Sequence, residues 1–226
     1  MIIEAKNLVK TFKTGDSELR VLRSLNFAVA EGEFVSIIGR SGSGKSTLLY
    51  QLGLLDQPTG GEILIEGRNT ATLTPEERTY VRLTELGYVF QDYALVPELS
   101  AAENVMVPLL MRGTPKDLAL ADAIAVLEQV GLKERAHFLP SRLSGGEQQR
   151  VSIARAIGHA PKILFADEPT ANLDNDTSLV IMDVFKDLHK QGQTIIMVTH
   201  EPEYAEMTDR IVTLFDGVIS KEESRI

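Results

Sequence analysis

The stretch Gly39-Arg40-Ser41-Gly42-Ser43-Gly44-Lys45-Ser46 matches G-x-x-x-x-G-K-[ST], the pattern of loops that bind nucleoside triphosphates. Glycines allow successive backbone N–H groups to converge on phosphate oxygens without interference from a Cβ atom. Lys45 supplies a positive charge for the β- and γ-phosphates, and Ser46 supplies a hydroxyl ligand for Mg²⁺. These residue types at this spacing therefore predict a phosphate-binding loop.

The segments on either side of the loop support this prediction. Residues 33–38 form a short apolar, β-branched run between two glycines, which is typical of a strand. Residues 47–52 are mostly apolar and indicate a helix, whose N-terminal dipole favours a bound anion. The alternative is a glycine-rich turn without a ligand, but the order strand, loop and helix favours nucleotide binding.

Composition limits the possible classes of protein. The 226 residues carry a net charge of −9, which opposes binding along a nucleic acid backbone, although a local basic patch remains possible. The chain has no cysteine, so disulfides and thiolate zinc sites are excluded. It also lacks an apolar run of about 18 residues and a secretion signal. We therefore expect a cytoplasmic protein that reaches a membrane only through a partner.

The distribution of apolar patterns predicts one α/β domain over residues 1–226. Residues 1–94 and 159–226 form the α/β core with a β-rich start, and residues 95–158 form a mainly helical subdomain. No internal repeat is visible, and the chain has a single phosphate loop. The expected strands cover residues 2–9, 25–30, 33–38, 62–66, 162–167, 194–199, 210–215 and 218–221.

Capping signals predict where several helices begin. Thr74-Pro75-Glu76-Glu77 combines an N-cap, a proline at the first position and a capping-box glutamate. Thr114-Pro115-Lys116-Asp117 repeats this pattern with an aspartate, and a third helix is expected after Asp174. The apolar faces of the last two helices are predicted to consist of Leu120, Ala123, Ile124, Leu127 and Val130, and of Ile181, Val184, Phe185 and Leu188.

Asp167-Glu168 closes the predicted strand at 162–167. A triphosphatase needs a carboxylate near Mg²⁺ and a group that orients or deprotonates the attacking water. Two carboxylates at the carboxyl end of a parallel strand meet both needs, because ligands bind at that edge of a sheet. The alternative is a solvated acidic loop before Pro169, and the phosphate loop favours the catalytic interpretation.

A second glycine-containing motif lies at Leu143-Ser144-Gly145-Gly146-Glu147-Gln148. Ser144 and Glu147 have the spacing of a capping box, so the simpler interpretation is a helix start. Paired glycines in the first turn lower helix propensity by about 1 kcal/mol each relative to alanine. Exposed N–H groups that bind an anion would compensate for this loss. The sequence thus predicts two anion sites, with only one complete nucleotide loop.

The order of these motifs resembles that of ATP-binding cassette (ABC) ATPases over essentially the whole chain. The matching segments are residues 39–47, Gln91, residues 143–148, 163–168 and 172–174, and His200. The resemblance implies a P-loop NTPase, RecA-like core with an antiparallel β subdomain and a helical signature subdomain. It also implies that the 143–148 signature of one subunit covers the ATP bound to the loop of another, in a head-to-tail dimer.

The resemblance assigns the remaining roles, with ATP and Mg²⁺ as ligands. Lys45, Gln91, Glu168 and His200 are the expected catalytic residues, and Ser46, Gln91 and Asp167 the expected metal ligands. The expected nucleotide contacts are Phe12, Gly39, Arg40, Ser41, Gly42, Ser43, Gly44, Lys45, Ser46, Thr47, Ser144, Gly145, Gly146, Glu147 and Asp174. Phe12 stands where the family usually has a tyrosine stacked on adenine, and Asp174 matches the aspartate that contacts the opposite subunit.

Within the family, residues 39–44, 88–91 and 166–174 are most similar to the branch for lipoprotein release, macrolide efflux and cell division, although Ala171 replaces the commoner glycine. The implied partners are a second copy of the chain, joined in the presence of ATP, and an integral membrane permease. Through the permease, the chain is expected to lie on the inner face of the cell membrane. Some apolar residues of 93–111 are candidates for a groove that receives a permease helix. Nucleic acid is not an expected partner.

Two alternatives are a soluble ABC ATPase that acts on nucleic acid or the ribosome, and a structural module without hydrolysis. The first alternative is disfavoured because the chain has no sustained heptad run between residues 46 and 143, no cysteine and only one cassette. The second is disfavoured by the presence of Lys45, Asp167, Glu168 and His200 together.

Overall fold

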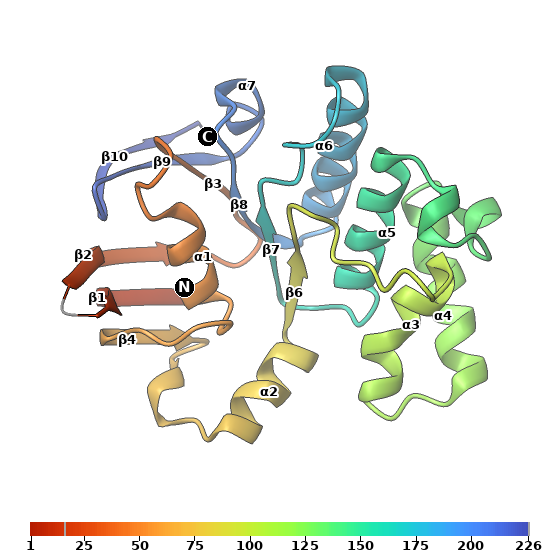
Figure 1. The fold of residues 1–226 in the computed structure, drawn as a ribbon, viewed down its shortest axis with the longest axis horizontal. Coiled ribbons are helices and arrows are strands. Elements are labelled where there is room, and N and C mark those ends of the chain that lie inside the picture. Colours follow the sequence, from red (N-terminus) through yellow and green to blue (C-terminus); the bar gives the residue numbers. More distant parts are fainter. Residues whose placement is uncertain (16, 226) are drawn as a thin grey trace.

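The computed structural model describes residues 1–15 and 17–225, whose strands form two sheets joined through the first helix (Figure 1). The strands are β1 (Ile3–Thr14), β2 (Ser17–Val29), β3 (Phe34–Ile38), β4 (Gly60–Ile65), β5 (Arg68–Asn69), β6 (Leu86–Val89), β7 (Ile163–Asp167), β8 (Thr194–Val198), β9 (Arg210–Phe215) and β10 (Val218–Ser224). The helices are α1 (Lys45–Leu52), α2 (Pro75–Thr84), α3 (Ala101–Met111), α4 (Lys116–Gln129), α5 (Gly145–Ile157), α6 (Asn175–Lys190) and α7 (Pro202–Ala205), with 3-10 turns at Thr70–Thr72, Lys133–Arg135 and Pro140–Arg142.

The smaller sheet is antiparallel and has the strand order β2-β1-β4-β5. Its first two strands are longer than the predicted ranges 2–9 and 25–30, and β10 also continues beyond residue 221. The ends of β1 and β2 form a hairpin whose side chains are mostly exposed, so the apolar alternation that marks a half-buried strand is absent there. Backbone pairing along the hairpin, from Ile3 opposite Val29 to Thr14 opposite Ser17, maintains these strands without such a pattern.

The larger sheet has the order β10-β9-β3-β8-β7-β6, in which β10 is antiparallel to β9 and the other neighbours are parallel. Side chains of β3, β7 and β8 alternate between two hydrophobic cores. Phe34, Leu164 and Met197 belong to one core, whereas Val35 and Phe165 belong to the other. The central strands are therefore covered by hydrophobic residues on both faces.

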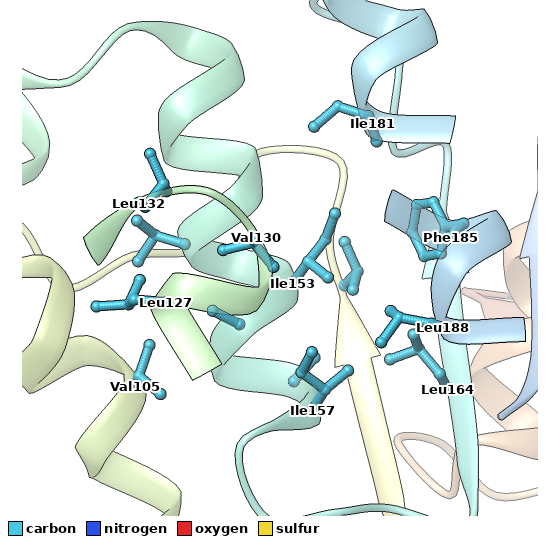
Figure 2. Packing of buried hydrophobic residues seen from close by; sticks show 14 of the residues in the cluster. Val105, Leu127, Val130, Leu132, Ile153, Ile157, Leu164, Ile181, Phe185 and Leu188 are labelled. Carbon is cyan, nitrogen blue, oxygen red and sulfur yellow. The ribbon is translucent and has the colours of Figure 1, made fainter. Parts of the chain in front are cut away.

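Different helices cover the two faces of the larger sheet. Leu48, Leu49 and Leu52 of α1 belong to the core shared with the antiparallel sheet. On the opposite face, α5 and α6 lie against the sheet, and α3 and α4 pack on α5 farther out. Figure 2 shows Ile153 and Ile157 of α5 between residues of α3 and α4 on one side and those of β7 and α6 on the other. The arrangement confirms the predicted α/β fold with an antiparallel sheet and a helical part.

Several helix predictions can be compared directly with the structure. Thr74 caps α2 through a capping box, as predicted. The prediction that Thr114 caps the next helix was wrong, because α4 begins at Lys116, its N-cap is Pro115, and no side chain caps it. The expected apolar faces of α4 and α6 are at least partly buried throughout.

The expected helical region 95–158 contains no helix before residue 101. Ser100 and Glu103 form a capping box at the start of α3, so the S-x-x-E pattern that the sequence analysis left unused marks this boundary. Among the described residues, no helix has both the length and the apolar character needed to cross a membrane.

Candidate functional site

The phosphate loop connects β3 to α1. Gly39 and Gly44 have φ angles of +154° and +101°, which favour glycine, and a Cβ on Gly39 would overlap the carbonyl oxygen of Leu214. Lys45 opens the helix with its side chain folded back onto the loop, where Nζ donates to the carbonyl oxygens of Gly39 at 3.0 Å and Arg40 at 3.3 Å. Hydrogen bonds within the protein therefore hold the loop around the Lys45 ammonium group without the help of a phosphate.

A cleft of about 910 Å³ lies over this loop. It joins most of the predicted phosphate loop to Glu168 and His200, which are far away in the sequence. The residues that line it are Leu19, Val21, Ile38, Gly39, Arg40, Ser41, Gly42, Gly44, Lys45, Ser46, Thr47, Glu168, His200 and Pro202.

Ser46 and Asp167 form the predicted pair at the floor of the loop. The Ser46 hydroxyl donates to Asp167 Oδ1 at 3.0 Å, and Asp167 is only 4% exposed. Burial raises the pKa of Asp167, and the hydrogen bond from Ser46 partly opposes this shift. A hydroxyl and a buried carboxylate are the hard oxygen donors that Mg²⁺ prefers, so these two residues fit the ion.

Tyr50 is a neighbour of this pair that the sequence analysis missed. It lies one helical turn after Ser46 on α1, so the two side chains share a face. Burial and the nearby charge of Asp167 raise the pKa of Tyr50 to about 12. The i, i+4 spacing from Ser46 is the sequence signal that could have indicated its position.

Glu168 and His200 meet at the edge of the cleft. His200 Nδ1 lies 3.2 Å from Glu168 Oε2, and the Glu168 side chain is 20% exposed. The backbone of Glu168 has a φ of +45°, and its N–H donates to Val198 O at 2.9 Å. A further contact, from Thr170 Oγ1 to Glu201 Oε2 at 2.9 Å, joins the two loops that carry this pair.

Among the predicted contacts that do not line the cleft are Phe12, Ser43 and Gln91. Phe12 is 42% exposed with Lys10 Nζ 4.9 Å from its ring centroid, but its partner across the hairpin, Leu19, does line the cleft. The Ser43 hydroxyl is buried and has no hydrogen-bond partner among the described residues. Gln91 is exposed, and its carbonyl oxygen accepts from Asn172 Nδ2 at 3.2 Å.

The apolar wall formed by Leu19 and Val21 was also missed by the sequence analysis. Both residues lie on the same side of β2, two positions apart, and both line the cleft. Their alternation was visible in the sequence, but nothing local indicated that this part of the hairpin faces the phosphate loop.

The 143–148 motif begins α5 with the predicted capping box. Ser144 Oγ accepts from Glu147 N at 3.2 Å, and Glu147 Oε2 accepts from Ser144 N at 2.8 Å. The hydrogen bond from the Ser144 backbone holds the pKa of Glu147 below its usual value. The hollow beside this helix start contains Ser144, Gly146 and Glu147 and shares no residue with the main cleft.

The structure gives Gly146 a packing role that the sequence analysis did not consider. A Cβ at this position would overlap Cγ2 of Thr177 on α6, so close helix packing by itself requires a glycine. Asp174 likewise caps α6, where Oδ1 accepts from Thr177 N at 2.8 Å. Packing against α6 is thus a reason for the glycine at 146 in addition to the predicted anion site.

The family model described as "ABC transporter" matches residues 22–171. The chain is 46% identical to the lipoprotein-releasing system ATP-binding protein LolD of Aquifex aeolicus, over all of this chain and 99% of that protein. It is 43% identical to the macrolide export ATP-binding/permease protein MacB 2 of Aeromonas hydrophila. That match covers 99% of this chain, which spans only 35% of the relative's length.

Solved structures agree with the sequence relatives. The dimeric structure of the ATP-binding cassette MJ0796 in a post-hydrolysis state, bound to ADP and Pi, superposes with a TM-score of 0.91 at 41% identity. The superposition covers 98% of both chains. A second dimeric structure of MJ0796, described as a bacterial ABC transporter cassette, gives a TM-score of 0.92.

Proposed function

The chain belongs to the ABC transporter family, and from this premise we propose that it is the ATP-binding and ATP-hydrolysing subunit of a transport complex. The observation that carries the proposal is the set of residues brought together at one cleft. Lys45, Ser46, Glu168 and His200 all line it, and Asp167 contacts Ser46 directly below. A phosphate loop, an oxygen pair for a cation and a carboxylate–imidazole pair are the parts that phosphoryl transfer to water requires.

Each group has a role that follows from its contacts. Lys45 exchanges its two carbonyl acceptors for oxygens of the β- and γ-phosphates when ATP enters, while the loop N–H groups hold the same oxygens. Ser46 and Asp167 hold the Mg²⁺ ion; the chemistry that this ion supplies when bound is partial neutralisation of the phosphate charge.

Glu168 acts as the general base or water-orienting group for the attack on the γ-phosphorus. Its carboxylate is partly shielded from solvent and is oriented by the imidazole of His200 at 3.2 Å. His200 is more exposed than Glu168, so its ring can contact the γ-phosphate from the open side of the cleft. Gln91 is proposed to reach the metal only after its loop moves, because it does not line the cleft.

Hydrolysis is proposed to take place in a head-to-tail dimer of two copies. The dimeric MJ0796 structures support this assembly. The separation of the two motifs within the chain supports it as well, since Ser144 and Gly146 line a different hollow from the phosphate loop. In the dimer, Ser144, Gly145 and Gly146 of one copy would cover the triphosphate of the other, and Asp174 would contact the opposite subunit.

The membrane partner is proposed to be an integral membrane permease, which holds this chain at the cytoplasmic face of the membrane. The MacB relative is named as an ATP-binding/permease protein and is much longer than this chain, whereas the LolD relative has nearly the same length. The names of both relatives support a permease partner of the lipoprotein-release and macrolide-efflux branch. The names of these relatives give no support to the nucleic acid alternative.

A phosphate-release assay with Mg²⁺ and ATP tests the proposal. Glu168→Gln should retain ATP binding and slow turnover by about 10²–10⁴-fold, because the amide cannot accept a proton. Glu203→Gln, in an exposed residue of α7, is the matched control and should leave turnover unchanged. An unaltered rate in Glu168→Gln, or no Mg²⁺-dependent hydrolysis by the unaltered chain, would contradict the proposal.

A further inference from the structure

The turn between β9 and β10 lies against the phosphate loop, although it is far from the loop in the sequence. Gly217 N donates to the Ser43 carbonyl oxygen at 3.1 Å, and the Gly217 carbonyl oxygen accepts from Arg23 N at 2.9 Å. The turn therefore bonds the loop through its N–H and β2 through its C=O. An ion pair from Arg23 to Asp216, at 2.9 Å, adds a third connection on the surface.

The three segments meet without space for an additional atom. A Cβ on Gly217 would overlap the carbonyl oxygen of Val21 and would lie 3.0 Å from the Val21 carbonyl carbon. A Cβ on Gly44 would lie 3.2 Å from Val21 Cγ1, from Leu22 Cδ2 and from the same Val21 carbonyl oxygen. Since these contacts involve backbone and branched side chains, β2 cannot move relative to the loop without disturbing the turn.

The position of β2 determines one wall of the cleft. Leu19 and Val21 line the cleft from β2, while residues 39–47 line it from the loop. A nucleotide that touches both would place its base against the apolar side chains and its phosphates on the loop N–H groups. The distance between the two walls then determines whether one nucleotide can contact both at the same time.

We propose that the Asp216-Gly217 turn is a positioning element that sets the distance between the base-side wall of β2 and the phosphate loop. This inference rests on the proposed function, because it takes ATP as the ligand of the cleft. It assigns to residues outside the ABC motifs a role in nucleotide affinity, exerted through Val21 and Ser43.

Titration calorimetry with two ligands tests the proposal. Gly217→Ala forces the turn away from Val21 while keeping the N–H that bonds Ser43. We expect the dissociation constant of Mg·ADP to rise by about 10-fold or more, since an apolar contact of the base is lost. Inorganic tripolyphosphate, which uses only the loop, should bind within about 2-fold of the unaltered chain. In hydrolysis, KM for ATP should rise with kcat unchanged.

Gly67→Ala is the matched control. Glu66 and Gly67 form a two-residue hairpin turn with φ of +49° and +75°, close to the +47° and +76° of Asp216 and Gly217. A Cβ on Gly67 would meet nothing within 4 Å. Both variants therefore carry the same backbone strain, but only Gly217→Ala should weaken Mg·ADP binding.

The outcomes separate this inference from the proposed function. Equal weakening of Mg·ADP and tripolyphosphate, or no weakening of either in folded Gly217→Ala, overturns the positioning role. Should Gly217→Ala fail to fold, Arg23→Ala carries the test, because it removes only the side chain that pairs with Asp216. It should weaken Mg·ADP alone by about 2- to 5-fold, and unchanged Mg·ADP binding would overturn the proposal. Failure of the unaltered chain to bind either ligand would instead refute the proposed function.

Discussion

At the scale of single residues, His159 is a buried histidine whose protonated, charged form is unfavourable in the folded chain. It follows α5, is 8% exposed, and uses Nε2–H to donate to Leu86 O at 3.0 Å. Its Nδ1 is buried without a hydrogen-bond partner among the described residues. Burial, with a smaller contribution from the charge of Arg112, lowers the pKa of His159.

This lowered pKa predicts how stability depends on pH. The unfolded chain binds a proton at His159 near pH 6.5 and the folded chain only at lower pH, so acidification favours unfolding. Below about pH 6.5 the unaltered chain should lose up to about 1.4 kcal/mol per pH unit more than His159→Gln, until the pH falls below the folded pKa. Urea denaturation between pH 8 and 5 measures both curves, and parallel curves would refute the assignment.

At the scale of elements, the close contact between α5 and α6 makes a testable prediction. Helix propensity alone would let Gly146→Ala stabilise the protein by about 1 kcal/mol. Overlap of the new methyl group with Thr177 Cγ2 should instead destabilise it by about 1–3 kcal/mol. Gly145→Ala is the control. Its Cβ would lie 3.0 Å from the hydroxyl of Tyr93, which can move away, so this variant should not show the destabilisation expected for Gly146→Ala.

Thr177→Ser provides the second half of this test. The serine lacks Cγ2 but keeps the hydroxyl that donates to Asp174 Oδ2 at 2.9 Å. Urea midpoints should show that Gly146→Ala combined with Thr177→Ser is more stable than Gly146→Ala alone. If the two substitutions are simply additive, the packing explanation for Gly146 is wrong.

At the scale of the whole molecule, the proposed dimer can be tested by mixing two inactive variants. Lys45→Ala should abolish the function of the phosphate loop. Ser144→Arg should abolish the function of the 143–148 signature without weakening ATP binding to the monomer. In a mixed head-to-tail dimer, one site combines both defects and the other combines two intact halves. The mixture should therefore recover about a quarter of the normal phosphate release per chain, whereas either variant alone remains inactive. No recovery in a mixture shown to form dimers would contradict composite sites.

The sequence alone predicted the parts of the site that depend on local order. The loop 39–46, its flanking strand and helix, and the two carboxylates at the end of β7 were predicted from spacing and periodicity. The inclusion of His200 in the site needed the family resemblance, because an isolated histidine after a strand carries no specific signal. Its contact with Glu168 was not predicted.

The missing contacts join segments that are far apart in the chain. Tyr50 beside Asp167, and Gly217 beside Ser43, depend on how the strands are ordered in the large sheet. Strand order is a property of long-range packing, and periodicity within each strand does not encode it. The hairpin of β1 and β2 was predicted too short for a different reason, because its exposed ends lack apolar alternation.

The alternation of side chains along the central strands has a consequence for how such a chain can change its length. In β3, β7 and β8, core residues that are adjacent in the chain belong to different cores. Inserting or deleting one residue inside any of these strands would exchange every following side chain between the helical side and the α1 side. Insertions and deletions are thus restricted to the connections between elements, and the number of residues in β3, which leads into Gly39, is fixed.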